Sequence, residues 1–281
     1  MALKIIDTVF GKKEIDMINH AAFGEIPKTV YKYRDWRDDY HKRILTHNEV
    51  YLSSPEEFND PFDCGIEIAY DLLQKDERLR FEYFSTFVSR ARKDLTPLQQ
   101  SAEVEKLIAE KRYENNKWLE YVHNQSLLEL NKRFGFFCVT PVPDNILMWS
   151  HYSNSHKGFC VGFDSVKLFS LINGRGGQVF YRDNYPLISP LLHPIEQSMH
   201  QTNSKAHFWN YEIEYRLMKH IKEGRILTLP PDVIRSVILG CSIPPQHKDE
   251  IVKTLKESQP NVMLYQASVK RRTYELDMVE L

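Results

Sequence analysis

The segment NILMWSHYSNSHKGFCVGFD, residues 145–164, joins two kinds of secondary structure. Met148 and Tyr152 are four residues apart, so on a helix they lie one turn apart on the same face. The apolar run that follows, GFCVGFD (158–164), is short, which is typical of a buried strand. The segment therefore predicts a helix followed by a strand. The helix is either catalytic or an aromatic plug that covers the sheet.

The flanking sequence predicts a mixed sheet. Short runs of alternating or continuous apolar residues favour further strands at 28–34, 49–55, 134–141, 178–181, 212–221, 236–244 and 261–270. Helical spacing is found at 190–208, at 245–258 and throughout a long charged region, 70–133. Because strands and helices do not alternate regularly, we predict a single α+β domain over 1–281. Its sheet core is mixed and largely antiparallel, with a helical insertion at about 70–133.

Composition excludes several classes of protein. The net charge is −1, so the chain has no overall positive potential that would attract nucleic acid. Hydrophobic residues make up 42% of the chain, which is ordinary for a globular protein. The N-terminal stretch becomes charged too early for a signal peptide, and no apolar run is long enough to span a membrane. The four cysteines show no CxxC pairing. We therefore expect a soluble cytoplasmic protein with reduced thiols, no bound metal and no membrane partner.

Two polar clusters lie at the ends of the first two predicted strands. In YKYR (31–34), Arg34 offers a planar fork for a phosphate or carboxylate, and Tyr33 can stack or donate. In YLSSPEEFNDPFD (51–63), Ser53 and Ser54 precede a turn rich in Asn and Asp. The plain alternatives are a surface salt bridge at Arg34 and turn or capping chemistry in the second cluster.

The other two clusters are the helix at 148–152 and WNYEIEYR (209–216). Trp149, His151 and Tyr152 of the helix are predicted to form one wall of a cleft. If residues 212–216 are extended, Glu212, Glu214 and Arg216 point to the same side of the strand. Two neighbouring carboxylates raise each other's pKa, so that one can act as a base, with Arg216 offsetting the charge. The alternative is a solvated edge with an ordinary ion pair.

In their order along the chain, YKYR, LSSPEEFNDPFDC, MWSHYSNSHKGFCVGFD and the segment with YEIEYR resemble the bacterial domain-of-unknown-function family 2971. The resemblance spans about residues 28–220. Members of that family have no assigned activity and are found in bacteria, often near mobile or defence-type genes. The resemblance implies a cytosolic setting.

A second resemblance is to ADP-ribosyltransferases of the Arg-Ser-Glu kind, because Arg34, Ser53 or Ser54, and the Glu212-Ile-Glu214 motif occur in that order. It implies that Arg34 holds the diphosphate of NAD, that the serine positions the glutamate, and that Glu214 stabilises an oxocarbenium-like ribose. It further implies that an aromatic residue stacks on nicotinamide, for which the candidates are Tyr33, Trp149 and Tyr152. The sequence lacks the Ser-Thr-Ser triplet of that pattern.

Three hypotheses follow for function. The first is an NAD-using ADP-ribosyltransferase or NAD hydrolase acting in phage defence or toxicity. The second is a non-catalytic binding or sensor module for a nucleotide or a nucleic-acid end. The third is a metal-dependent nuclease, which would need Asp60, Asp63, Glu212 and His151 to converge. The first hypothesis expects Arg34, Trp149, His151 and Glu214 to line one pocket.

Overall fold

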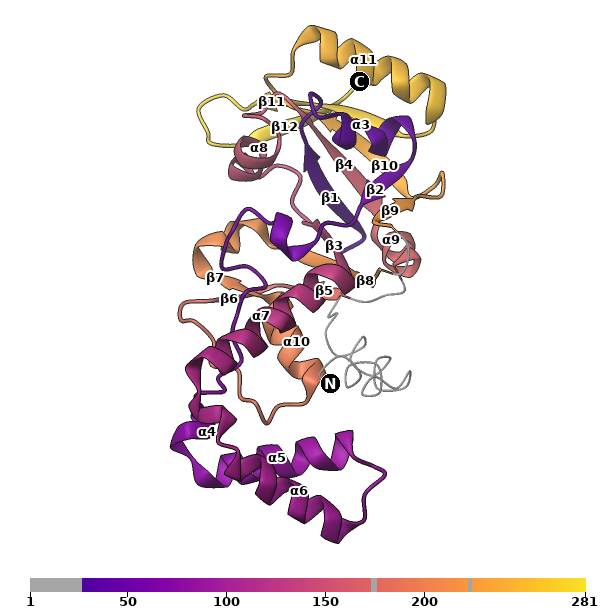
Figure 1. The fold of residues 1–281 in the computed structure, drawn as a ribbon. Coiled ribbons are helices and arrows are strands. Elements are labelled where there is room, and N and C mark those ends of the chain that lie inside the picture. The colour runs from indigo at the N-terminus through magenta and orange to yellow at the C-terminus, as the bar shows by residue number, and fades with distance from the viewer. Residues whose placement is uncertain (1–26, 173–175, 222–223) are drawn as a thin grey trace.

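Within the described residues, a five-stranded sheet forms one end of the molecule (Figure 1). The structure is a computed structural model that describes residues 27–172, 176–221 and 224–281; the charged N-terminal stretch lies outside them. The strands of this sheet are, in spatial order, β1 (Thr29–Arg34), β4 (Phe159–Asp164), β10 (Ile234–Leu239), β11 (Met263–Val269) and β12 (Leu276–Glu280). Within this five-stranded sheet, the β10–β11 pair is parallel and the other pairs are antiparallel.

Shorter strands form the rest of the sheet structure. They are β2 (Glu49–Tyr51) with β9 (Ile226–Thr228), β6 (Phe180–Arg182) with β7 (Ser204–Ala206), and a three-stranded sheet of β3 (Phe134–Val139), β8 (Tyr215–His220) and β5 (Gly176–Gln178). Two isolated bridges connect β3 with the first part of the chain: Tyr31 pairs with Thr140, and Ser53 pairs with Phe136. β3 is thereby fixed against β1 at one end and against the segment after β2 near the other.

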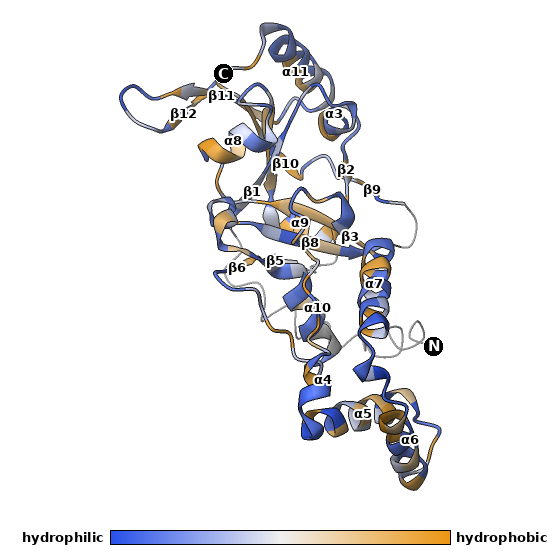
Figure 2. Ribbon diagram, turned by 60° about the vertical axis from the view of Figure 1, so that its left-hand side comes forward, coloured by the Kyte–Doolittle hydropathy of each residue, from blue (hydrophilic) through white to orange (hydrophobic). Residues whose placement is uncertain are grey.

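Helices cover both faces of the larger sheet, which explains why β4 is buried along nearly its whole length. On one face the core includes residues of α3 (Asp39–Thr46), α9 (Ser165–Leu171) and α11 (Pro245–Ser258). On the other face Trp149 of α8 (Ile146–Tyr152) packs with Tyr33 and Cys160. In Figure 2, apolar colours follow β10 and polar colours dominate α11, as expected for buried strands under an amphipathic helix.

A separate helical region lies between β2 and β3. Its helices are α4 (Leu72–Lys75), α5 (Glu77–Ala91), α6 (Pro97–Ala109) and α7 (Asn116–Arg133), with 3-10 turns η1 (Pro55–Glu57) and η2 (Arg112–Glu114). The side chains of Asp76 and Thr96 cap α5 and α6. α4, α5 and α6 project away from the five-stranded sheet (Figure 1), and this region has a small core of its own that includes Phe84, Val88 and Tyr113.

The α+β class and the mixed, mostly antiparallel sheets are confirmed. Several elements differ from the prediction. The stretch 190–208 is divided into α10 (Pro194–Asn203), β7 and the start of η3 (His207–Glu212), the predicted strand 178–181 is divided between β5 and β6, and the short strand β9 and the last strand, β12, were not predicted. Periodicity could not detect the three-residue β7, because so short a strand has no repeat. Within the described residues, no helix is both long and apolar enough to cross a membrane.

Candidate functional site

A cavity of about 230 Å³ is lined by residues of both β1 and β3. Its wall is built from β1, the segment after β2, β3, α8, β7 and the η3–β8 junction. These segments are far apart in the sequence, and the two isolated bridges join the parts of the wall that come from β1, from β3 and from the segment after β2. Aromatic side chains such as Tyr31, Tyr51, Phe58 and Tyr152 form much of the surface, and charged groups of both signs lie among them.

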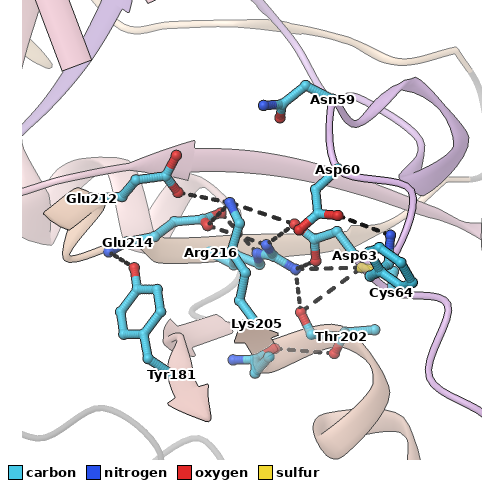
Figure 3. Close-up of polar contacts among 12 residues, drawn as sticks. Asn59, Asp60, Asp63, Cys64, Tyr181, Thr202, Lys205, Glu212, Glu214 and Arg216 are labelled. Carbon is cyan, nitrogen blue, oxygen red and sulfur yellow. Dashed lines mark hydrogen bonds and ion pairs between the residues drawn. The ribbon is translucent and has the colours of Figure 1, made fainter. Parts of the chain in front are cut away.

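A buried network of ion pairs forms one part of this wall (Figure 3). The guanidinium of Arg216 donates to Asp63 at 2.5 and 2.7 Å, to Glu214 at 2.7 and 3.1 Å, and to the carbonyl oxygen of Thr202 at 2.6 Å. The ammonium of Lys205 donates to Glu212 at 2.7 Å and to Glu214 at 3.2 Å. Arg216 is only 1% exposed, so its charge depends on these acidic partners.

The two glutamates differ in protonation chemistry. For Glu214, burial alone would raise the pKa, but the charges of Arg216 and Lys205 outweigh it and hold the pKa well below its usual range. For Glu212, burial is the largest effect and raises the pKa; the charge of Lys205 opposes this rise and the charge of Glu214 adds to it, and the pKa remains raised. The Oε1 atom of Glu212 also accepts a bond of 2.6 Å from the Tyr152 hydroxyl. Of the two, Glu212 is therefore the carboxylate that is protonated more readily.

The backbone at Ile213 explains how both carboxylates reach Lys205. The strand predicted for 212–221 is wrong at its start: η3 extends to Glu212, and β8 begins at Tyr215. Between them Ile213 has φ 44° and ψ 50°, a left-handed conformation that is strained for a β-branched residue. The convergence of Glu212 and Glu214 expected from strand alternation therefore has a different cause, a kinked junction.

Lys32 and Arg34 form the β1 part of the wall. Within the described part of the chain, neither side chain has a hydrogen bond or an ion pair, and the Lys32 ammonium lies 5.2 Å from the centroid of the Phe137 ring. Burial, followed by the charge of Arg34, lowers the pKa of Lys32 to about 8. Burial likewise lowers the pKa of Arg34 to about 10. Acidic charges act on both cations only from a distance, Asp38 on Arg34 and the two glutamates on Lys32, so the pair is suited to bind an anion directly.

The segment at 145–164 positions α8 against β1. The Asn145 side chain caps α8 and also donates to the carbonyl oxygen of Tyr211 at 2.7 Å, which connects the helix to η3. After α8, three consecutive residues are left-handed, Asn154, Ser155 and His156, with φ between 48° and 65°. A Cβ at Gly158 would lie 2.1 Å from the carbonyl oxygen of Arg34, so glycine is needed for this close approach.

The structure brings six of the predicted site residues to the cavity: Tyr33, Arg34, Ser53, Tyr152, Glu212 and Glu214. Tyr33 contributes little free surface, because its ring packs against Trp149 and its hydroxyl donates to the carbonyl oxygen of Val142.

Three predicted residues do not line the cavity. Trp149 is 0% exposed within the core, so the predicted wall contact and stacking are not possible for it in this structure. The exposed side chain of His151 lies beside Tyr211, outside the cavity. The hydroxyl of Ser54 is engaged with Glu56 in the capping turn η1. The segment is thus both a core plug, through Trp149, and a wall of the cavity, through Tyr152.

Lys32, Lys205 and Cys138 were missed by the sequence reasoning. Lys32 could have been found, because it shares strand parity with Arg34, two residues on. Lys205 gave no signal, since it lies in a stretch predicted as helix. Cys138 lines the cavity as well, and burial, with the adjacent Glu214, raises the pKa of its thiol to about 12.

The four residues required for a metal-dependent nuclease are not assembled as metal ligands. Asp63 and Glu212 are held by cations, and His151 lies outside the cavity. Across the described ranges, no group of three or more His, Cys, Asp or Glu side chains is placed to hold a metal ion.

Comparison with known proteins gives one match. Residues 148–217, about a quarter of the chain, match a family described as "Protein of unknown function (DUF2971)". The matched range begins in α8 and ends in β8, so it contains Tyr152, Lys205 and both glutamates of the cavity. No curated protein and no solved structure matches the chain significantly.

Proposed function

We propose that the cavity binds NAD and that the protein consumes it, either as an ADP-ribosyltransferase or as an NAD hydrolase. The proposal depends on one observation above all: Lys32 and Arg34 face the cavity without an acidic partner among the described residues. Desolvating a cation without a partner costs free energy, so such a pair indicates a site for an external anion. The diphosphate of NAD is an anion of this kind.

The cavity also has a group suited to the ribose. Cleavage of the bond to nicotinamide builds positive charge on the ribose, and a carboxylate that bonds a ribose hydroxyl stabilises that charge. We assign this role to Glu212. The expected residue, Glu214, is a poorer candidate because its carboxylate is also paired with Arg216, in addition to Lys205, which both glutamates share. Tyr152 then orients Glu212 through its 2.6 Å hydrogen bond.

The size of the cavity limits how NAD can bind. Sites for small ligands usually measure about 300–1,000 Å³, whereas this cavity is about 230 Å³. It can therefore enclose only one end of NAD. We assign the enclosed part to the ribose and the adjoining phosphates, because the charged groups of the wall match them, and the adenosine would lie outside.

Nicotinamide release from NAD, followed by proton NMR, tests the proposal. Wild type should release nicotinamide, and Glu212→Gln should lower the rate about a hundred-fold, as removal of a group that stabilises transition-state charge does. Glu257→Gln is the matched control, because Glu257 is exposed on α11. The absence of release by wild type, or an undiminished rate in Glu212→Gln, would contradict the proposal.

A second candidate, a nucleotide-binding module without turnover, has one observation in its favour. Both oxygens of Glu212 already accept hydrogen bonds, one from Lys205 and one from Tyr152. A carboxylate held in this way can be purely structural, while Lys32 and Arg34 still bind an anion. This candidate predicts that NAD raises the melting temperature through binding to the native state, with no nicotinamide released. The role in phage defence or toxicity stays a prediction.

A further inference from the structure

Lys32 differs from an ordinary surface lysine in both its contacts and its position. Its side chain lies in the cavity wall, over the face of Phe137, without a hydrogen-bond acceptor or an acidic partner among the described residues. Arg34, two residues further along β1, lines the same cavity. The amine is therefore not held by a carboxylate, and its residue borders the space that a small molecule would enter.

We infer that Lys32 is the nucleophilic amine of a site for phosphorylated aldehydes, such as open-chain sugar phosphates, with Arg34 holding the phosphate. The Lys32 nitrogen adds to the carbonyl carbon, and the carbonyl oxygen leaves as water after two proton transfers. The product is an imine between Lys32 and the sugar, so the step needs no oxidant or reductant. The inference concerns the cavity itself and goes beyond NAD as its ligand.

The groups around Lys32 support both its role as a nucleophilic amine and the binding of the phosphate by Arg34. The positive charge of Arg34 and the burial of the ammonium lower the pKa of Lys32 to about 8, which leaves a substantial neutral fraction near physiological pH. The guanidinium supplies a planar fork for the phosphate oxygens. The remaining ionisable groups that influence Lys32 are Cys138, Glu214 and Glu212.

Glu212 can assist the loss of water. Burial raises the pKa of Glu212, so its carboxyl is protonated more readily than that of Glu214 and is the better donor of a proton to the leaving hydroxyl. Glu212 belongs to the same cavity wall as Lys32. Glu214 cannot perform this role, because its pKa is held low by Arg216 and Lys205.

Reductive trapping tests the inference. Full-length protein is incubated at pH 7.5 with ribose 5-phosphate and cyanoborohydride, which reduces an imine to a stable secondary amine, and the modified lysines are mapped by mass spectrometry. A lysine with a pKa of about 8 has roughly a hundred-fold larger neutral fraction at this pH than an unperturbed one. We expect Lys32 to be modified at least ten-fold faster than any other lysine, and inorganic phosphate to compete.

Three comparisons make the result decisive. Lys32→Arg should remove the fast adduct, whereas Lys253→Arg, at a side chain that is 76% exposed, should leave it unchanged. Arg34→Gln should slow trapping of ribose 5-phosphate but not of ribose. Modification spread evenly over the lysines, or equal rates for the two sugars in wild type, would overturn the inference. Mapping the adduct on the wild-type protein does not depend on the folding of any variant. Trapping at Lys32 without nicotinamide release would contradict the proposed NAD activity and leave this inference standing.

Discussion

Arg216 is predicted to be the residue on which the buried network depends most. Arg216→Met replaces the guanidinium with an apolar chain of similar length and removes five hydrogen bonds to oxygen atoms of Asp63, Glu214 and Thr202. Lys205 remains, at 3.6 Å from Asp63 and 3.2 Å from Glu214, so the two carboxylates lose only part of their compensation. Removing one partner of a buried ion pair costs about 3–5 kcal/mol. For a chain of this size that corresponds to a fall of about 10 °C in Tm.

Thermal unfolding followed by circular dichroism measures this change. Arg235→Met is the matched control, because Arg235 forms a 2.6 Å ion pair with Asp164 while its side chain is 49% exposed. Its loss should cost less than about 1 kcal/mol. Combining Arg216→Met with Glu214→Gln should recover part of the loss, since the second change removes a carboxylate left without its partner. If Arg216→Met is no more destabilising than Arg235→Met, the network does not hold the cavity wall together.

Three further predictions concern single residues. Lys32→Met should raise the free energy of unfolding by about 1–2 kcal/mol at pH 7. In the folded protein the pKa of Lys32 is about 8, below its ordinary value of 10.5, so burying the charged ammonium destabilises the fold fully below pH 8 and less and less as the pH rises toward 10.5. An equal increase in the free energy of unfolding at pH 7 and at pH 10 would contradict this. Because the folded pKa of Glu214 is lowered, its ionised carboxylate stabilises the fold above its ordinary pKa of 4.5, and this stabilisation is lost as the pH falls. Between pH 5 and pH 3, the free energy of unfolding measured in urea should therefore fall less for Glu214→Gln than for wild type. Gly158→Ala should destabilise by about 2 kcal/mol, because its Cβ would overlap the carbonyl oxygen of Arg34, and an unchanged Tm would count against that close approach.

The sequence was sufficient for the elements that carry a strong local signal. β1, β4 and α11 appear where apolar runs and helical spacing predict them. The α+β class follows from their irregular order, and Arg34 could be chosen because it closes a strand. These inferences need only the periodicity of side chains along one element.

The sequence was not sufficient where contacts between distant parts of the chain decide which side chains face the cavity. Trp149 looked like a ligand contact, but whether an aromatic residue faces a cavity or the core depends on what packs against the helix, here Tyr33. The different roles of Glu212 and Glu214 depend on Lys205, which reaches them only after Ile213 takes a left-handed conformation. No local pattern signals such a conformation at a β-branched residue.

Calorimetric titration with ADP-ribose tests the central claim most directly, which is that the unpaired cations of β1 make the cavity a nucleotide site. Wild type should bind one ADP-ribose per chain. The variant carrying Lys32→Met and Arg34→Gln should remain folded and bind at least about a hundred-fold more weakly, because charge-assisted hydrogen bonds contribute about 1.5–3 kcal/mol each. Equal affinity in the two proteins, or no binding to wild type, would contradict the claim.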